Sequence, residues 1–579
     1  MSVAAQIQAD DEAAVDPITA EIISHGLQSI ADEISTNITR TAYSPLVYEY
    51  KDFACGLVDA EGHLIAQGSG SIPIFVTDAL GTAVRDGLEI YGRDRIHDGD
   101  VIITNHAGTL GQHLNNVSMY TPVFSDDGGK DLVGFMVVLV HWIDLGGKMV
   151  GSCTANDATE IFQEGIQYRS VKLWNKGERN EEMYRIVRYN TRFPDAVLGD
   201  LEAQLAGCVL GKEKFRAILR RYGKATVRAA VESAWNKSEL AARAAVRQIP
   251  DGVYSASAML DDDGINKGKT IAVDVVVKVS GDEVTIDLSG VADQVQGPLN
   301  SGRMGGAVTA ARIAYKYVTT PGEPANDGNF RALHVEIPDG KFLSASENAA
   351  MGKYSAPLPT VIDAIVQAFG KAAPDRAAAG HHSSFSSHLF FSDPNRPGGS
   401  YQHLDTGLGG WGATHDRDGG GPYKTMAHGD TLNVPAEVQE ALFPHRVECM
   451  KLRQDSAGAG EFRGGLGTEK LVRVLEPTKL NMSIERTKCP PWGINGGLPG
   501  VPGYALIERE GEEPVKMTKG LVSLNAGDCM RLFTAGGGGY GDPKKRSVDR
   551  VRHDLTAGYI SAEAAERDYA MSTRKKATE

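Results

Sequence analysis

Two histidines, each next to a loop that contains glycine, stand on either side of a strongly apolar stretch in the first third of the chain, and this arrangement constrains the fold most. The first loop, NHAGTLGQHLNN, contains His113 and leads into Val117–Phe124 and Leu132–His141, whose apolar and β-branched residues predict strands. The second loop, WIDLGG, follows His141 directly. Because buried metal sites are usually assembled from strand ends, the pattern predicts a metal enzyme.

The candidate metal ligands are Asp52, His113 and His141. Asp52 stands at the entrance of another predicted strand, FACGLVD. A divalent metal in a hydrolytic or Lewis-acid role needs a mixed histidine and carboxylate shell with one open position. Asn116, three residues after His113, is a weaker and neutral candidate. The alternative is that all four are ordinary polar groups of loops and strand ends, and spacing alone leaves both interpretations open.

Three acidic residues are candidates for supporting roles. Asp144 follows His141 by three residues, so it can orient a histidine by accepting its second N–H, or cap the turn before Gly146. Glu49 and Glu164 lie in partly apolar surroundings and are candidates for a general base or a substrate contact. A solvated glutamate is the alternative at both positions.

The overall charge excludes some classes of partner. The chain has 579 residues and a formal net charge of -14, which disfavours nucleic acid and anionic membrane surfaces. The first residues lack a basic and apolar leader, and no segment reaches the roughly 18 apolar residues that span a bilayer. These features predict a soluble cytoplasmic protein.

Motifs that would indicate other chemistry are missing from the sequence. The six cysteines have no CxxC spacing, which argues against a zinc–thiolate site and against a disulfide framework, and predicts reduced, mostly structural thiols. The glycine-rich loops do not match GxxxxGK[ST], so no nucleotide site is expected, and GxSxG and HExxH are absent as well. The glycine-rich loops remain candidates for a surface that contacts a partner.

The patterning along the chain predicts an α+β, multidomain fold. Alternating runs after Pro250 predict an antiparallel sheet, and Asp126–Lys130 predicts a turn between two strands. The expected parts are a disordered tail (1–15), an α/β domain with the metal site (16–179), a helical subdomain (180–249), a mixed β-sheet domain with helical inserts (250–443), a β-rich domain (444–545), and C-terminal helices with a tail (546–579).

Many ordered motifs make the chain resemble one known family. They include RTAYSP, KDFACGLVDAEGHLIAQ, NHAGTLGQHLNN, HWIDLGG, ATEIFQEGI, GPLNSG, DSAGAGEFRGGLG, CPPWGINGG and AGGGGYGDP, and they run from about Pro17 to Tyr569. The chain is similar to the hydantoinase B/oxoprolinase family, the B-type subunits of ATP-dependent N-methylhydantoinases and lactamases, which is also related to acetone carboxylase subunits.

The resemblance implies a metal site and a partner. The family's metal ligands fall on Asp52, His113, Asn116 and His141, with zinc or manganese expected, and the family has Asp where this chain has Asn116 and His106. The implied partner is an A-type subunit with an actin-like ATPase fold, which binds ATP and phosphorylates the substrate oxygen. The chain is then expected to work in a hetero-oligomer.

The leading hypothesis is the metal-site subunit of an ATP-dependent cyclic amide hydrolase, which opens a hydantoin, oxoproline or lactam ring. An ATP-dependent ketone carboxylase subunit of the acetone or acetophenone type is the alternative within enzymes. A non-catalytic scaffold, in which Asn116 marks a lost site, is the third hypothesis, and it predicts that no metal binds.

Overall fold

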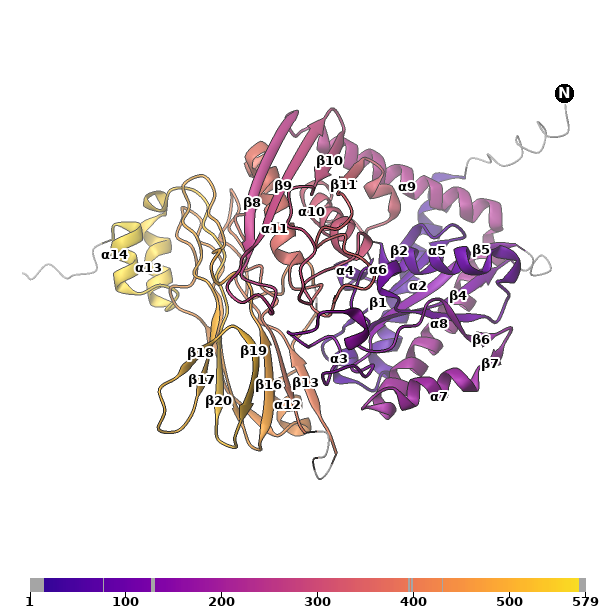
Figure 1. The fold of residues 1–579 in the computed structure, drawn as a ribbon. Helices are drawn as coiled ribbons and strands as arrows, with labels where there is room; N and C mark the ends of the chain where they lie inside the picture. The colour runs from indigo at the N-terminus through magenta and orange to yellow at the C-terminus, as the bar shows by residue number, and fades with distance from the viewer. Residues whose placement is uncertain are drawn as a thin grey trace, which may run out of the picture.

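The fold was analysed in a computed structural model, which describes residues 15–76, 78–125, 131–393, 396, 399–429 and 431–571. The expected N-terminal tail lies outside these residues except for Val15. The turn expected at Asp126–Lys130 and the tail after Met571 also lie outside them. The described part is an α+β assembly of several sheets and helices, as expected (Figure 1).

The first module is built on a seven-stranded sheet in the order β2-β1-β5-β4-β3-β6-β7, in which every neighbouring pair is antiparallel. Its strands are β1 Phe53–Asp59, β2 Leu64–Gln67, β3 Val101–Thr104, β4 Asn116–Phe124, β5 Leu132–His141, β6 Val171–Asn175 and β7 Glu178–Arg179. Its helices are α2 Pro17–Thr41, α3 Pro45–Tyr48, α4 Pro73–Val76, α5 Ala79–Tyr91, η1 Arg93–Arg95, α6 Ala107–Leu110 and η2 Ile161–Gln163.

The long helix α2 forms where the sequence predicts one. The Asp16 side chain accepts a hydrogen bond from Thr19 N at 2.9 Å, and Pro17 occupies the first turn, where its missing N–H costs nothing. Apolar side chains at helical spacing, including Ile23, Leu27 and Ile34, are buried. They belong to the same buried cluster as the strands of the first sheet.

The segment expected as a helical subdomain forms α7 Glu181–Tyr189, α8 Pro194–Tyr222 and α9 Lys224–Val246. These helices lie against the first module (Figure 1). Their buried residues, such as Phe215 and Val231, share one apolar cluster with the sheet. None of the helices in the described ranges has the length and apolar character that crossing a bilayer requires.

The second sheet differs from the expectation in one strand. Its order is β11-β10-β9-β8, from β8 Gly252–Leu260, β9 Ile271–Ser280, β10 Glu283–Asp287 and β11 Leu333–Glu336. The antiparallel pairing predicted from the alternating runs is confirmed for β8, β9 and β10, but β11 pairs parallel to β10, so for this strand the prediction is wrong. The chain between them contains η3 Met304–Val308, α10 Thr309–Thr319 and η4 Asp327–Phe330, and a crossover of this length returns a strand in parallel. The helix α11 Leu358–Ala372 and the turn η5 Pro374–Arg376 follow.

The C-terminal part is a pair of packed antiparallel sheets (Figure 1). One has the order β13-β12-β16-β19 and the other the order β14-β15-β20-β17-β18. The strands are β12 Ser387–Phe391, β13 Gln402–Asp405, β14 His445–Leu452, β15 Thr468–Val474, β16 Thr478–Ser483, β17 Tyr504–Glu508, β18 Val515–Met517, β19 Lys519–Leu524 and β20 Cys529–Phe533. The helical elements are α12 Ala436–Leu442, η6 Pro543–Lys545, α13 Val548–Thr556 and α14 Ala562–Tyr569.

Extended glycine-rich segments pack together beside these sheets, and we call them the glycine bundle: 379–382, 409–412, 456–465, 491–499 and 535–541. Their backbones bond to one another; Gly537 N donates to Gly465 O at 2.9 Å, and Gly537 O accepts from Gly458 N at 2.8 Å. A Cβ at Gly537 would lie 2.1 Å from the carbonyl oxygen of Trp411, so only glycine fits. The glycines of 536–539 are buried, so this segment does not offer the exposed contact surface suggested for it.

Candidate metal centre

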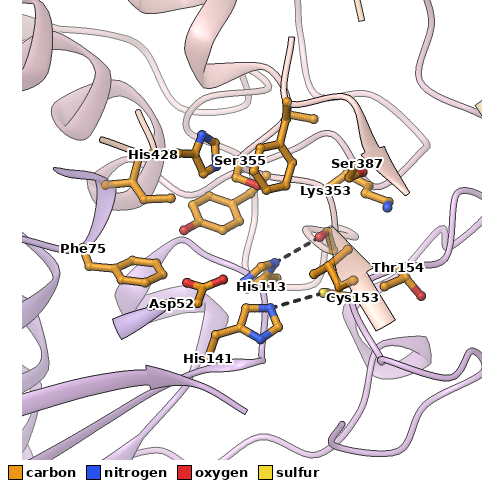
Figure 2. A pocket seen from close by; sticks show the side chains of 16 residues that line it. Asp52, Phe75, His113, His141, Cys153, Thr154, Lys353, Ser355, Ser387 and His428 are labelled. Atoms are coloured by element: carbon orange, nitrogen blue, oxygen red, sulfur yellow. Dashed lines mark hydrogen bonds between the residues drawn. The ribbon is translucent and has the colours of Figure 1, made fainter. Parts of the chain in front are cut away.

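A small cavity of about 40 Å³ lies where three modules meet: the first module, the second sheet with its helices, and the C-terminal pair of sheets. Asp52, His113 and His141 reach it from the first module, and Figure 2 shows them facing the same space. The opposite wall comes from residues 352–356, which precede α11, and from residues around β12 and β13. The three ligands expected from the sequence therefore converge, and the wall that closes them in comes from distant parts of the chain.

The antiparallel register explains why these ligands converge. His141 ends β5 and lies opposite Asn116, the first residue of β4. On the other side of β5, His141 N donates to the backbone oxygen of Asp52 at 3.1 Å, just before β1 begins. Neighbouring strands thus deliver Asp52, His141 and Asn116 to one edge of the sheet.

His113 is held by contacts to both ring nitrogens. Its Nδ1 lies 3.1 Å from the carbonyl oxygen of Gly352, and its Nε2 lies 2.8 Å from Asn116 Oδ1. A neutral imidazole carries only one N–H, so the other nitrogen keeps a lone pair that can bind a cation. The rings of His141 and Tyr354 pack edge-on against His113, with centroids at 4.9 Å and 4.8 Å.

Burial dominates the electrostatics of the cavity. It raises the pKa of the Asp52 carboxyl to about 7 and that of the Cys153 thiol to about 12. It lowers the pKa of His113 to about 4 and that of His141 well below its ordinary value. Burial thus favours the neutral form of every one of these groups, and a bound cation would stabilise the carboxylate and the thiolate instead.

These side chains fit a divalent cation. Ligand atoms of His113, His141 and Cys153 all lie within 4.8 Å of one another, and all three residues are buried. Within the part of the chain that the structure describes, His141 Nδ1 has no hydrogen-bond partner, and the buried Asp52 carboxyl lines the same cavity. Asp52 is not one of the group within 4.8 Å, so binding by all four requires its carboxylate to move towards the histidines.

Asn116 lies beside His113, and both atoms of its side-chain amide contact neighbouring side chains. Its Nδ2 donates to Gln112 Oε1 at 3.0 Å and to the Tyr354 hydroxyl at 2.9 Å, while Oδ1 faces His113. The amide oxygen is therefore placed to be a weak neutral ligand, or to orient the His113 ring. The weak-ligand role expected for Asn116 stays a prediction.

Asp144 does not orient a histidine. One carboxylate oxygen accepts from Arg192 Nη1 at 2.8 Å and from Gly151 N at 3.1 Å. The other accepts from Arg192 N at 2.8 Å and from Gly146 N and Thr191 Oγ1 at 3.2 Å. The hydrogen bond from Gly146 N agrees with the alternative interpretation, in which Asp144 caps the glycine turn. The partner expected to be a histidine is instead Arg192, which comes from a distant loop.

The two candidate glutamates, Glu49 and Glu164, lie in different places relative to the cavity. Glu49 is partly buried after α3 and is not among the residues that line the cavity. Glu164 is buried below the cavity wall, and its Oε1 accepts from Gly352 N at 2.7 Å. Burial raises the Glu164 pKa to about 8. It therefore supports the wall that contacts His113.

The sequence analysis does not place Cys153, Lys353 or His428 at the cavity, and the spacing of His428 predicts only a loop histidine. Cys153 was treated as structural, although it stands in a loop shortly after His141; its soft sulfur ligand was the available signal. Lys353 and His428 come from distant segments with no spacing that relates them to the metal residues. His428 stacks on Phe385 with centroids at 4.0 Å, and its Nε2 is buried with no partner among the described residues.

Comparison of the sequence with known families and proteins gives one consistent result. The profile of the family described as hydantoinase B/oxoprolinase matches residues 16–543. Caprolactamase subunit beta of Pseudomonas jessenii is 31% identical over 573 residues, which are 96% of this chain and 96% of that protein. The 5-oxoprolinase 1 of Arabidopsis thaliana is 27% identical over 555 residues, which are 92% of this chain and 42% of that protein.

Solved structures have the same fold. The crystal structure of ATP-dependent caprolactamase from Pseudomonas jessenii superposes with a TM-score of 0.89 and 28% identity, and the match covers 98% of both chains. The nucleotide-free structure of acetone carboxylase superposes with a TM-score of 0.85 over 97% of this chain and 80% of that chain. Its identity of 18% is evidence for a shared fold alone.

Proposed function

The chain belongs to the hydantoinase B/oxoprolinase family, and from this membership we propose that it is the metal-site subunit of an ATP-dependent cyclic amide hydrolase. Its substrate would be a hydantoin, an oxoproline or a lactam. The observation that carries the proposal is the convergence of Asp52, His113 and His141 at adjoining strand ends in one buried cavity.

The geometry of the cavity suggests a role for each site residue. Asp52, His113 and His141 would hold a divalent metal, with Asn116 as a weak ligand or as the group that orients His113. When bound, the metal would supply Lewis-acid activation of water and of the ring carbonyl. The apolar wall, which includes Phe75, Leu404 and Phe385, limits the entry of bulk water.

The size of the cavity indicates how the substrate reaches it. About 40 Å³ accommodates an ion and one or two waters, because a water needs roughly 10–15 Å³ measured in the same way. A five- or seven-membered ring needs more space. We therefore propose that the wall formed by residues 352–356 moves outwards when substrate enters.

Lys353 is the group best placed to bind an anionic substrate. Its side chain lines the cavity and is only partly buried, and no hydrogen bond or ion pair of its Nζ is found within the described ranges. Burial lowers its pKa to about 8, so the ammonium form is accessible near neutral pH. An ammonium group at this place can hold a phosphoryl group or a developing carboxylate.

The names and lengths of the relatives support the proposal of a partner subunit for this chain. One relative is named as a subunit beta, and the plant 5-oxoprolinase aligns with this chain over only 42% of its length. We propose that an A-type ATPase subunit binds ATP and phosphorylates the substrate, and that this chain completes ring opening within a hetero-oligomer. The sequence of this chain contains no P-loop motif, in agreement with that division of labour.

A ketone carboxylase subunit is the second candidate, because acetone carboxylase has the same fold. The test is to purify the chain together with its A-type partner and to supply ATP and Mg²⁺. Hydantoin, 5-oxoproline and caprolactam are offered in one series, and acetone or acetophenone with labelled bicarbonate in another. Ring opening is followed by chromatography of the amino acid product.

We expect ATP-dependent ring opening that His113→Ala abolishes while the complex remains assembled. Incorporation of labelled bicarbonate without ring opening would support the carboxylase instead. If His113→Ala left the rate of either reaction unchanged, the chain would be a scaffold.

A further inference from the structure

Cys153 lies beside the two histidines of the cavity, although the family resemblance assigns it no ligand role. Its Sγ lies 3.8 Å from His141 Nε2, and it shares the 4.8 Å ligand group with His113 and His141. Tetrahedral zinc with Zn–N near 2.0 Å and Zn–S near 2.3 Å requires a separation of about 3.5 Å between the nitrogen and the sulfur. A contraction of a few tenths of an ångström therefore converts the observed contact into coordination.

The backbone around Cys153 is built to hold this position. Cys153 N donates to Asn115 Oδ1 at 3.2 Å, and Asn115 Nδ2 donates to the Trp142 carbonyl oxygen at 2.6 Å. Trp142 N returns a hydrogen bond to Asn115 O at 2.8 Å. Asn115 thus ties the loop that carries Cys153 to the residue next to His141, and the two ligands are positioned as one unit.

Charge supports the same assignment. Asn116 is neutral, so the carboxylate that the resemblance leads one to expect at this position is missing. The buried Asp52 carboxylate supplies one negative charge beside the group. A thiolate at Cys153 would supply the second negative charge, which a carboxylate at the position of Asn116 would otherwise provide.

We propose that Cys153 is a thiolate ligand of the metal centre and replaces the carboxylate missing at Asn116, so that the centre takes zinc or another thiophilic divalent ion rather than manganese or magnesium. On binding, the sulfur–metal bond forms and the thiol proton is released to solvent. The preference follows from ligand softness, since thiolates favour zinc and carboxylates favour manganese and magnesium. The inference rests on the metal centre of the proposed function.

The test reads coordination directly and needs no substrate. The full-length chain is loaded with one equivalent of Co²⁺, and the absorption spectrum is recorded. We expect a sulfur-to-cobalt charge-transfer band in the near ultraviolet, together with the intense visible bands of a tetrahedral site. Cys153→Ser should lose the charge-transfer band and bind zinc at least about tenfold more weakly.

The matched control is Cys529→Ser, because Cys529 is also buried but lies in β20, and its thiol donates to a carbonyl oxygen that serine can still reach. This variant should keep the band. If Cys153→Ser does not fold, X-ray absorption of the zinc-loaded wild type decides the matter. One sulfur at about 2.3 Å supports the proposal, and a shell of nitrogen and oxygen alone at about 2.0–2.2 Å overturns it.

A second pair of variants tests the charge argument. The double variant Cys153→Ser with Asn116→Asp exchanges the thiolate for a carboxylate, and its affinity for Mn²⁺ relative to Zn²⁺ should rise by at least about tenfold. An unchanged ratio would contradict the replacement of one charge by the other. If sulfur binds the metal but the complex opens no ring, the proposed function is wrong and the role of Cys153 stands. If the complex opens the ring at a metal without a sulfur ligand, the role of Cys153 is wrong and the proposed function stands.

Discussion

Glu164 and His113 bind the two ends of one residue, Gly352. Glu164 Oε1 accepts from Gly352 N at 2.7 Å, and the carbonyl oxygen of Gly352 lies 3.1 Å from His113 Nδ1. The carboxyl group therefore positions the backbone that in turn positions the imidazole. A partner that fixes the orientation of a ligating histidine has a measurable effect on the affinity of the metal.

Glu164→Ala should weaken zinc binding by about 10- to 100-fold, because Gly352 N loses its acceptor and the His113 ring loses its fixed orientation. Glu164→Gln keeps an amide oxygen for Gly352 N and should stay within a few-fold of the wild type. Competition with a chromophoric chelator measures both constants. Equal losses in the two variants would show that the hydrogen bond to Gly352 is not the link.

His403→Phe should make the protein less sensitive to acid. Burial lowers the pKa of His403 well below its ordinary value of 6.5, so below pH 6.5 the unfolded chain binds a proton that the folded chain does not. The stabilisation that the neutral, buried His403 contributes to the folded state is fully present above pH 6.5 and is lost as the pH falls below this value. Removing this histidine should therefore reduce the slope of the free energy of unfolding against pH by up to about 1.4 kcal/mol per pH unit.

The replacement also keeps the ring stack. His403 packs on Phe443 with centroids at 4.7 Å and on His445 at 5.0 Å, and both of its nitrogens lack partners in the described part of the chain. Denaturant unfolding from pH 7.5 to 5.5 measures the slope. His415→Gln, at an exposed position, is the control and should leave the slope unchanged. A variant with the slope of the wild type would argue against a neutral buried His403.

Asp144→Ala should destabilise the fold by about 3 kcal/mol, because it leaves the Arg192 guanidinium and several backbone N–H groups without their acceptor. Removing Arg192 as well should recover part of the loss, and a double-mutant cycle measures this coupling. Asp157→Ala, which breaks the exposed ion pair with Lys148, should cost less than about 1 kcal/mol. Additive losses at Asp144 and Arg192 would contradict the pairing.

Lys353→Met should raise KM for the substrate by roughly tenfold or more, because a hydrogen bond to a charged group contributes about 1.5–3 kcal/mol. The metal content should not change. Lys353→Arg should retain part of the binding, and Lys148→Met, in an exposed ion pair, is the control. A KM that stays constant while kcat falls would move the role of Lys353 from binding to the reaction itself. Steady-state kinetics of the assembled complex separate these outcomes.

Sequence patterns predicted those parts of the site that depend on local order. Asp52, His113 and His141 are next to strands whose apolar runs are plain, and antiparallel pairing brings their ends together. Cys153 follows His141 closely in the sequence, but without CxxC spacing no pattern relates it to the two histidines that it lies beside in the cavity. The prediction about cysteines considered thiolates only as pairs, so it did not point to a single thiol beside histidines.

Other features depend on contacts that no local pattern contains. Lys353 and His428 enter the cavity only when three modules pack together. Arg192 forms an ion pair with Asp144, although it lies in a loop that follows all the strands of the first sheet in the sequence. The direction of β11 is also invisible to the pattern, because alternation of apolar residues is the same in parallel and antiparallel strands.

The glycine bundle sets an order on the synthesis of this protein. Gly410 N donates to Ala535 O, Gly458 N donates to Gly537 O, and Gly538 N donates to Gly380 O. These backbone groups of the earlier segments therefore bond to water, and not to their native partners, until the ribosome has made residues 535–541. A nascent chain that has passed Pro499 therefore holds these glycine segments without their native partners until residues 535–541 follow, so the bundle closes late in synthesis.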